Sequence, residues 1–210
     1  MVQTINKTKS NALINNQINQ IINLINQGNF QDALIIGQSL EEASENNPNV
    51  LSIMGMLNVE LGAHEDAIRY FRKVIKIRPY CALSSYKLAN LLNSTGQQEA
   101  AISSYKNAIR YKKNYADAHY CLGNVYSSVS KYRKAVTHYK EAIRLQPQLA
   151  AAHNNLGTAL TRLGRQNEAI DSYHCAISIK PDYSEAYHNL AVMQNICGKN
   201  EQAIVACLKS

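Results

Sequence analysis

The chain is 210 residues long, with 46% hydrophobic and 18% charged residues, so it can bury a core and is not disordered by composition. It has 22 Lys and Arg against 15 Asp and Glu, a net charge of +7, which permits an acidic partner without requiring one. The five cysteines are odd in number and form no C-x-x-C pair, which excludes a regular disulfide scaffold and the common zinc spacings and indicates a reducing, cytoplasmic compartment.

A polar lead-in, residues 1–13, precedes an internal repeat with a period of 34 residues. One alanine recurs at this interval, at Ala33, Ala67, Ala101, Ala135, Ala169 and Ala203. The repeat divides the rest of the chain into units 14–47, 48–81, 82–115, 116–149, 150–183 and 184–210, the last of them incomplete. Because no insertion breaks the register, residues 14–210 are expected to form one repeat array.

Each unit is predicted to form two antiparallel helices joined by a short turn. In unit 150–183 the first stripe of helical period consists of His153, Leu156, Gly157 and Leu160. The second stripe consists of Ala169, Ile170, Tyr173, Ala176 and Ile177. Gly164 ends the first helix and Pro181 stops the second, and small residues in both stripes let the helix axes approach closely. A serine, Ser130, fills the place of the turn glycine in unit 116–149.

This pattern, from His153 to Pro181 and its repeats, resembles the tetratricopeptide repeat (TPR) family over residues 14–210. The usual tryptophan of that family is absent, and unit 14–47 departs from the pattern at Gln20, Gly37 and Glu45, as a terminal capping unit does. The resemblance implies an all-α fold, a right-handed superhelical solenoid of TPR helix-turn-helix units. It also implies a concave groove lined by the first helix of each unit.

The expected lining of that groove is polar, nearly uncharged and rich in asparagine. It comprises Tyr86, Asn90, Asn93, Tyr120, Asn124, Ser127, Asn154, Asn155, Thr158, Thr161, Arg162, His188, Asn189 and Asn195. Asparagine carries both a donor and an acceptor and can pair with any peptide backbone, while tyrosine adds rigid contact area. The leading interpretation is a protein–protein interaction scaffold that binds an extended peptide or partner segment, and the alternative is a solvated face without a ligand.

The resemblance bears on two particular ligands. Some TPR proteins hold the terminal carboxylate of a chaperone with lysine, asparagine and arginine side chains; Asn124 and Asn155 match two of those positions, but Tyr120, Glu185 and Asn189 replace the basic ones. O-GlcNAc transferases hold their substrate on an asparagine ladder. Its position is matched by Asn19, Asn155 and Asn189 and missed by Ile53, Lys87 and Cys121. The alternative function is therefore the N-terminal substrate-recruiting arm of a larger transferase, either O-GlcNAc transferase-like or a sulfotransferase.

No catalytic signature is present, so the chain is not expected to be an enzyme, and no cofactor or metal is expected. His119 and His153, with Cys121 nearby, are residue types that could ligate a metal ion. We interpret the two histidines instead as packing residues in the place of the family's tryptophan. No apolar run approaches the roughly 18 residues of a membrane span. The basic residues gather near the ends of second helices without an aromatic platform, which argues against nucleic acid as the partner.

The last unit stops inside its second helix, where Ile204, Cys207 and Leu208 form an apolar stripe. Repeat arrays normally end with a polar capping helix. Three explanations are open: the chain is the N-terminal arm of a longer protein, its reading frame is truncated, or the bare end serves self-association.

Overall fold

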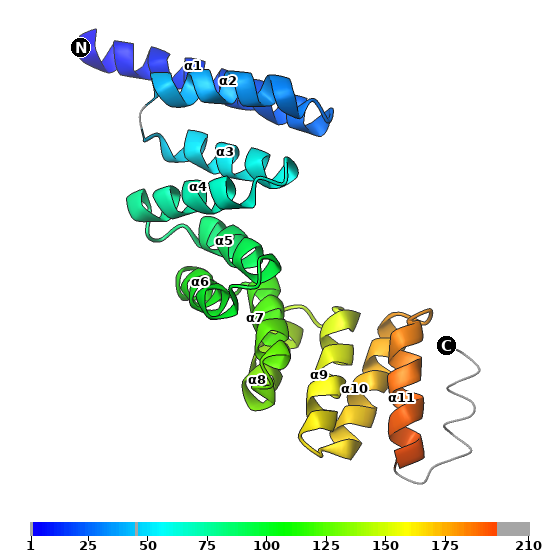
Figure 1. Cartoon of the computed structure of the whole chain (residues 1–210). Coiled ribbons are helices and arrows are strands. Elements are labelled where there is room, and N and C mark those ends of the chain that lie inside the picture. Colours follow the sequence, from blue (N-terminus) through cyan, green and yellow to red (C-terminus); the bar gives the residue numbers. More distant parts are fainter. Residues whose placement is uncertain (1, 45, 197–210) are drawn as a thin grey trace. The chain divides into compact units, whose positions relative to one another are not determined.

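A computed structural model describes residues 2–44 and 46–196, and every regular element within these ranges is an α-helix (Figure 1). The helices are α1 (Val2–Asn26), α2 (Phe30–Ala43), α3 (Pro48–Glu60), α4 (His64–Ile77), α5 (Ala82–Ser94), α6 (Gln98–Tyr111), α7 (Ala116–Ser128), α8 (Tyr132–Leu145), α9 (Ala150–Arg162), α10 (Gln166–Ile179) and α11 (Ser184–Ile196). The all-α helical-repeat architecture expected from the sequence is thereby confirmed. The expected apolar stripe at residues 204–208 and the alanine at 203 lie outside the described residues.

The odd-numbered helices from α3 onward begin at the residues where the repeat units were expected to begin, from Pro48 to Ser184 in steps of one period. At α3 the cause is local: the Asn47 side chain accepts a hydrogen bond from the Asn49 amide at 3.0 Å, and Pro48 occupies the first helical position. Helix α1 begins at Val2, so the stretch expected to be a polar lead-in is helical in this structure.

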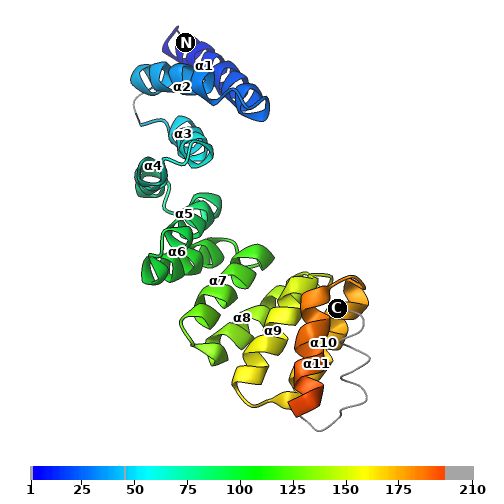
Figure 2. The ribbon, with the colours of Figure 1, turned by 45° about the vertical axis from the view of Figure 1, so that its right-hand side comes forward.

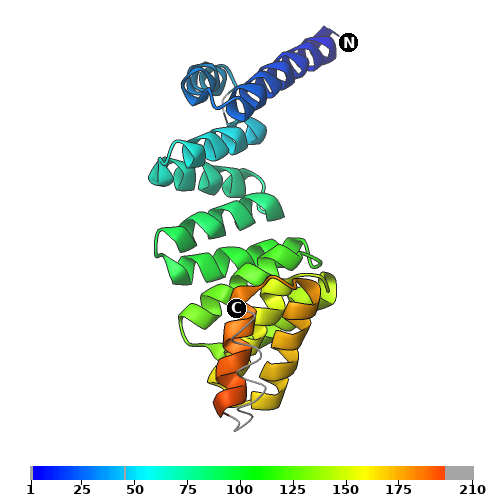
Figure 3. The ribbon, with the colours of Figure 1, turned by 90° about the vertical axis from the view of Figure 1, so that its right-hand side faces the viewer.

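The chain forms two compact units, Met1–Ser104 and Tyr105–Ser210, with the boundary inside α6. In the first unit, α3 packs against α2 and α4, and α4 packs against α5, so the helices form successive layers (Figure 3). In the second unit, α7 pairs with α8 and α9 pairs with α10, while α9 also touches α7 and α11 (Figure 2). In this second unit, the first helices of consecutive repeats therefore lie next to each other, which brings their polar residues together.

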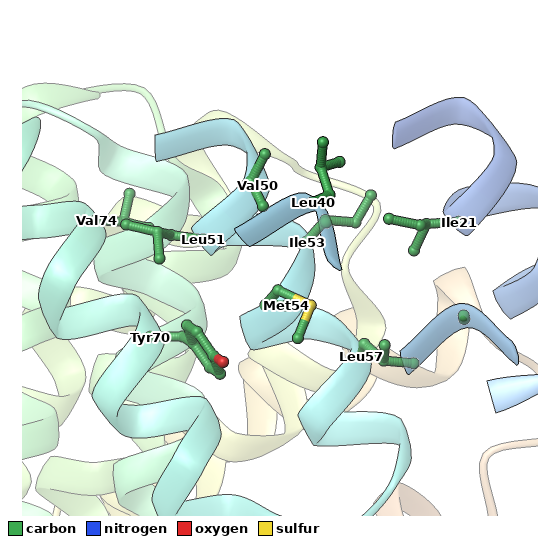
Figure 4. Packing of buried hydrophobic residues seen from close by; sticks show 10 residues of the cluster. Ile21, Leu40, Val50, Leu51, Ile53, Met54, Leu57, Tyr70 and Val74 are labelled. Carbon is green, nitrogen blue, oxygen red and sulfur yellow. The ribbon is translucent and has the colours of Figure 1, made fainter. Parts of the chain in front are cut away.

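The core of the first unit is centred on α3, which has apolar residues around most of its circumference (Figure 4). Leu51, Met54 and Leu57 are each at most 1% exposed, and Ile21 of α1 and Leu40 of α2 complete the cluster. A helix that is apolar on several faces is stable only between neighbours. The stacking of α2, α3 and α4 satisfies this requirement.

In the second unit, two helix pairs, α7 with α8 and α9 with α10, share one packing feature. A tyrosine ring on the second helix of the pair lies across a glycine on the first helix of the same pair. A Cβ on Gly157 would lie 2.6 Å from Cε1 of Tyr173, and a Cβ on Gly123 would lie 2.6 Å from Cε1 of Tyr139. Two of the recurring alanines, Ala135 and Ala169, are 0% exposed and allow the same close approach from the second helix. The small and large residues that recur in the sequence therefore pack against each other within these helix pairs.

The turn inside a pair requires a left-handed backbone at one residue. Gly62 has φ +71°, and its N–H donates to the Val59 carbonyl oxygen at 3.0 Å. The Ala63 N–H donates to the Asn58 carbonyl oxygen at 2.8 Å. In the repeat that lacks this glycine, Ser130 adopts the same conformation with φ 58°. Turn geometry, and not local propensity, therefore sets the backbone of Ser130.

Candidate functional site

A hollow of about 430 Å³ lies in the second unit, between residues of α7, α8, α9 and α11. We call it the second-unit groove. Its lining consists of Asn124, Ser127, Ser128, Tyr132, Tyr139, Asn155, Thr158, Arg162 and Glu185. One guanidinium and one carboxylate are the charged groups of this lining, and the rest is amide, hydroxyl and phenol.

Helix geometry explains why these side chains meet. Residues three, four and seven apart share one face of a helix, so Asn155, Thr158 and Arg162 project from α9 in one direction. Asn124 and Ser127 do the same on α7, which touches α9. The floor is therefore assembled from first helices of adjacent repeats.

The Asn124 amide is a junction between α7, α8 and α9. Its Oδ1 accepts a hydrogen bond from the Tyr139 hydroxyl at 2.9 Å and a second from Asn155 Nδ2, also at 2.9 Å. The same Asn155 nitrogen donates to the Tyr120 hydroxyl oxygen at 3.3 Å. Both lone pairs of the Asn124 oxygen are thus occupied by the protein itself.

A second junction connects α9 to α11 through Asn154, which is 0% exposed. Its Nδ2 donates to Asn155 Oδ1 at 3.3 Å and to Glu185 Oε1 at 3.1 Å, and its Oδ1 accepts from Asn189 Nδ2 at 3.0 Å. We call the linked side chains Tyr120, Asn124, Tyr139, Asn154, Asn155, Glu185 and Asn189 the amide network. It is continuous from α7 to α11.

The Tyr139 phenol is the buried end of this network. It is 1% exposed, and burial raises the pKa of Tyr139 far above its usual range, although nearby Ser127 and Asn155 act in the opposite direction. The phenol therefore keeps its proton and serves as a donor to Asn124.

Five of the residues expected in the groove line it: Asn124, Ser127, Asn155, Thr158 and Arg162. Three more, Tyr120, Asn154 and Asn189, contribute through the amide network. Asn154 was expected to face a ligand, but it is fully buried because α11 packs over it and can act only through its neighbours.

The remaining expected residues do not line this groove. The Thr161 hydroxyl bonds the Gly157 carbonyl at 3.0 Å, and His188 and Asn195 are exposed on α11. Tyr86, Asn90 and Asn93 lie on α5, in the first unit.

Four lining residues were not anticipated from the sequence: Ser128, Tyr132, Tyr139 and Glu185. Tyr139 stands one repeat period before Tyr173 of the second stripe, which identifies a packed ring but not the use of its hydroxyl. In the sequence, Glu185 was notable only because chaperone-binding TPR proteins have a basic residue at the corresponding position. The period of the pattern could therefore have pointed to both residues, but not to their contacts.

The histidines that suggested a metal are engaged in other contacts. His119 Nδ1 lies 3.1 Å from His138 Nδ1, and the ring of His138 stacks on Tyr126 with centroids 5.5 Å apart. Burial lowers the pKa of His138 to about 4, with a further contribution from His119. The His153 Nε2 lies 3.0 Å from the Pro147 carbonyl oxygen. Over the described residues, no three His, Cys, Asp or Glu side chains come together to hold a metal ion.

The basic excess is partly neutralised at the surface. On α4, Arg69, Arg72, Lys73 and Lys76 flank a shallow hollow of about 320 Å³, but Arg69 pairs with Asp66 at 2.8 Å and Lys73 with Glu41 at 3.5 Å. Such exposed pairs contribute about 0–1 kcal/mol each. None of the helices in the described part of the chain is long and apolar enough to cross a membrane.

Comparison with known proteins agrees with this architecture. The protein-family model described as "TPR repeat" matches residues 89–129 and 130–164. Two family models described as "Tetratricopeptide repeat" match residues 48–81 and 150–183. Together they cover more than half of the chain. No curated protein matches the chain.

Several solved structures share the fold. A crystal structure of MamA is 28% identical with a TM-score of 0.73, covering 74% of this chain and 91% of that one. MamA from Desulfovibrio magneticus RS-1 is 22% identical with a TM-score of 0.74, covering 81% and 96%. YrrB, described as "a TPR protein with an unusual peptide-binding site", is 18% identical with a TM-score of 0.74, covering 82% and 89%.

Stacked antiparallel helix pairs with a 34-residue period define a helical-repeat scaffold. The chain belongs to the tetratricopeptide repeat family.

Proposed function

We propose that the chain is a non-enzymatic scaffold whose second-unit groove binds an extended segment of a partner protein. The observation that carries this proposal is the amide network, which runs beneath the groove across three consecutive first helices. An extended backbone presents carbonyl and N–H groups along its length, and an amide that such a network holds in place can pair with one of them at little cost in side-chain entropy.

The Asn124 side chain supports this reading in detail. Its oxygen already accepts two hydrogen bonds, whereas none of the hydrogen bonds among the described residues uses its Nδ2. Both N–H groups are therefore available at the groove, whose lining also includes Arg162.

The charge of the lining argues for a protein segment over nucleic acid. Arg162 is its single cation, and Glu185 opposes it with a carboxylate. Nucleic-acid sites rely on several cations that neutralise phosphates. A binding curve that weakens steeply with salt would favour nucleic acid and contradict the proposal.

The likeness to YrrB, a TPR protein described as having a peptide-binding site, is compatible with a peptide ligand at the level of the fold. A recruiting arm of a larger transferase would hold its substrate in the same groove. This alternative therefore also requires Asn124 and Asn155 for binding. A cytoplasmic location also stays a prediction, and self-association through residues 204–208 concerns a segment outside the described residues.

The experiment is a peptide-array screen followed by fluorescence anisotropy with the best-binding peptide. Asn124→Ala and Asn155→Ala each remove a hydrogen-bonding amide, and a loss of about 1 kcal/mol corresponds to a roughly fivefold weaker affinity. Asn167→Ala, an exposed asparagine in the first turn of α10, is the matched control and is expected to bind like the parent protein. Equal affinities for all four proteins would refute the groove as the binding site.

A further inference from the structure

An asparagine amide has two ends of nearly equal shape, one a donor and one an acceptor, so its partners decide which end faces a ligand. Most members of the amide network are tyrosines and asparagines, which can donate or accept. Glu185 differs from them because an ionised carboxylate only accepts. It is the one member of the network that can orient the others without ambiguity.

The orientation passes from Glu185 to Asn154. The ionised carboxylate of Glu185 can only accept a hydrogen bond, so the nitrogen of the Asn154 amide must face it. The distance from Asn154 Nδ2 to Glu185 Oε1 is 3.1 Å. The Asn154 oxygen then faces Asn189 Nδ2, at 3.0 Å. The second N–H of Asn154 is left to donate to Asn155 Oδ1, at 3.3 Å.

The next step fixes Asn155 and Asn124. With its oxygen toward Asn154, Asn155 turns its nitrogen toward Tyr120 and Asn124. Asn124 must therefore offer its oxygen, which the Tyr139 hydroxyl also uses at 2.9 Å. The nitrogen of Asn124 is the end that remains for the groove.

We propose that Glu185 is a positioning residue that sets the polarity of the second-unit groove. Through Asn154 and Asn155 it makes Asn124 present N–H donors, and Arg162 adds further donors to the same lining. The groove accordingly selects a segment that turns oxygen acceptors toward Asn124 and Arg162, namely backbone carbonyls and an acidic side chain of an extended peptide. This inference rests on the proposed function and names the ligand chemistry of that same site.

The decisive variant is Glu185→Lys, which replaces an acceptor-only group by a donor-only group. A lysine ammonium requires the oxygen of Asn154, and the reversal then passes along the network until Asn124 turns its oxygen to the groove. Glu168→Lys is the matched control, because Glu168 is also an exposed glutamate in the first turn of a helix of the second unit but lies outside the network.

The first measurement needs no ligand: solvent exchange of the side-chain amide protons by ¹⁵N-resolved NMR. In the parent protein and in Glu168→Lys, the Asn154 and Asn155 protons are expected to be protected and the Asn124 protons to exchange rapidly. In Glu185→Lys, the Asn124 protons are expected to become protected. Protected Asn124 protons in the parent protein, or an unchanged pattern in Glu185→Lys, would overturn the inference.

The second measurement tests the ligand chemistry with sodium acetate, an acceptor, and methylammonium chloride, a donor, at equal ionic strength. Acetate is expected to bind at Asn124 of the parent protein at least about fivefold more tightly than methylammonium does, as one net hydrogen bond of about 1 kcal/mol implies. Titration of the Asn124 side-chain amide resonances with each probe measures the two affinities. Equal responses to the two probes would overturn the selection of acceptors. A peptide array without binders would instead count against the proposed function, since the exchange pattern does not depend on any peptide.

Discussion

Replacing Gly123 by alanine tests whether one packed ring holds the second-unit groove in shape. The added Cβ would lie 2.6 Å from Cε1 and 2.7 Å from Cδ1 of Tyr139, well inside the usual carbon–carbon contact of about 3.5 Å. The Tyr139 side chain is 1% exposed, so any movement of its ring disturbs the side chains packed around it. The ring, or the spacing between α7 and α8, must change.

The expected cost follows from two opposing effects. Forcing a methyl group into a packed core destabilises by about 1–3 kcal/mol, whereas alanine in place of glycine inside a helix stabilises by about 0.5–1 kcal/mol. We therefore expect Gly123→Ala to lower the free energy of unfolding by about 1–2 kcal/mol. Urea unfolding followed by circular dichroism measures this difference.

The same substitution is expected to weaken ligand binding. A displaced Tyr139 ring carries its hydroxyl away from Asn124 Oδ1, to which it now donates at 2.9 Å. Loss of this bond loosens the Asn124 amide, and about 1 kcal/mol corresponds to a roughly fivefold weaker affinity in the anisotropy assay.

Gly55→Ala provides the control, because its Cβ would press on Phe71, 3.0 Å away, in the first unit. Phe71 has no hydroxyl, so stability is expected to fall while affinity is retained. Unaltered stability of Gly123→Ala, or an equal loss of affinity in both variants, would refute the reasoning.

Two further predictions concern the turn and the histidine pair. Ser130 holds a left-handed backbone with φ 58°, which costs a non-glycine residue about 1–2 kcal/mol, so Ser130→Gly is expected to raise the urea midpoint; a lower midpoint would count against this. Burial and His119 lower the pKa of His138 from 6.5 to about 4, so the fold favours the neutral ring. The stability from this preference is present above pH 6.5 and is lost as the pH falls toward 4. His138→Gln is expected to flatten that part of the melting-temperature profile, and parallel profiles would contradict the assignment.

Much of the fold was predictable because its determinants are local and repeat. Glycine or serine at the turn, as at Gly62 and Ser130, sets where a first helix ends, and the proline and capping asparagine at residues 47–48 set where the next unit starts. Small residues and tyrosines at the repeat period predict the packing of a helix pair, since Gly123 and Tyr139 can lie together only if α7 and α8 are antiparallel neighbours.

The candidate site was predictable only in part. Residues three and four apart on one helix share a face whatever surrounds them, and Asn155, Thr158 and Arg162 accordingly line the same groove. Asn154 and Asn155 are adjacent in sequence and point about 100° apart, so the neighbouring helices decide which one is buried. Packing of α11 over α9 buries Asn154 and leaves Asn155 at the groove.

The sequence by itself determined the repeat, the helix pairs and the family, because each depends on residue type at a fixed spacing along one helix or one turn. Only the tertiary structure decided which polar groups meet. Asn124 and Asn155 are 31 residues apart, as are Asn154 and Glu185, and their hydrogen bonds exist because consecutive first helices lie side by side. Hydrogen bonds require a separation near 3 Å and a particular direction, and no periodic pattern specifies either.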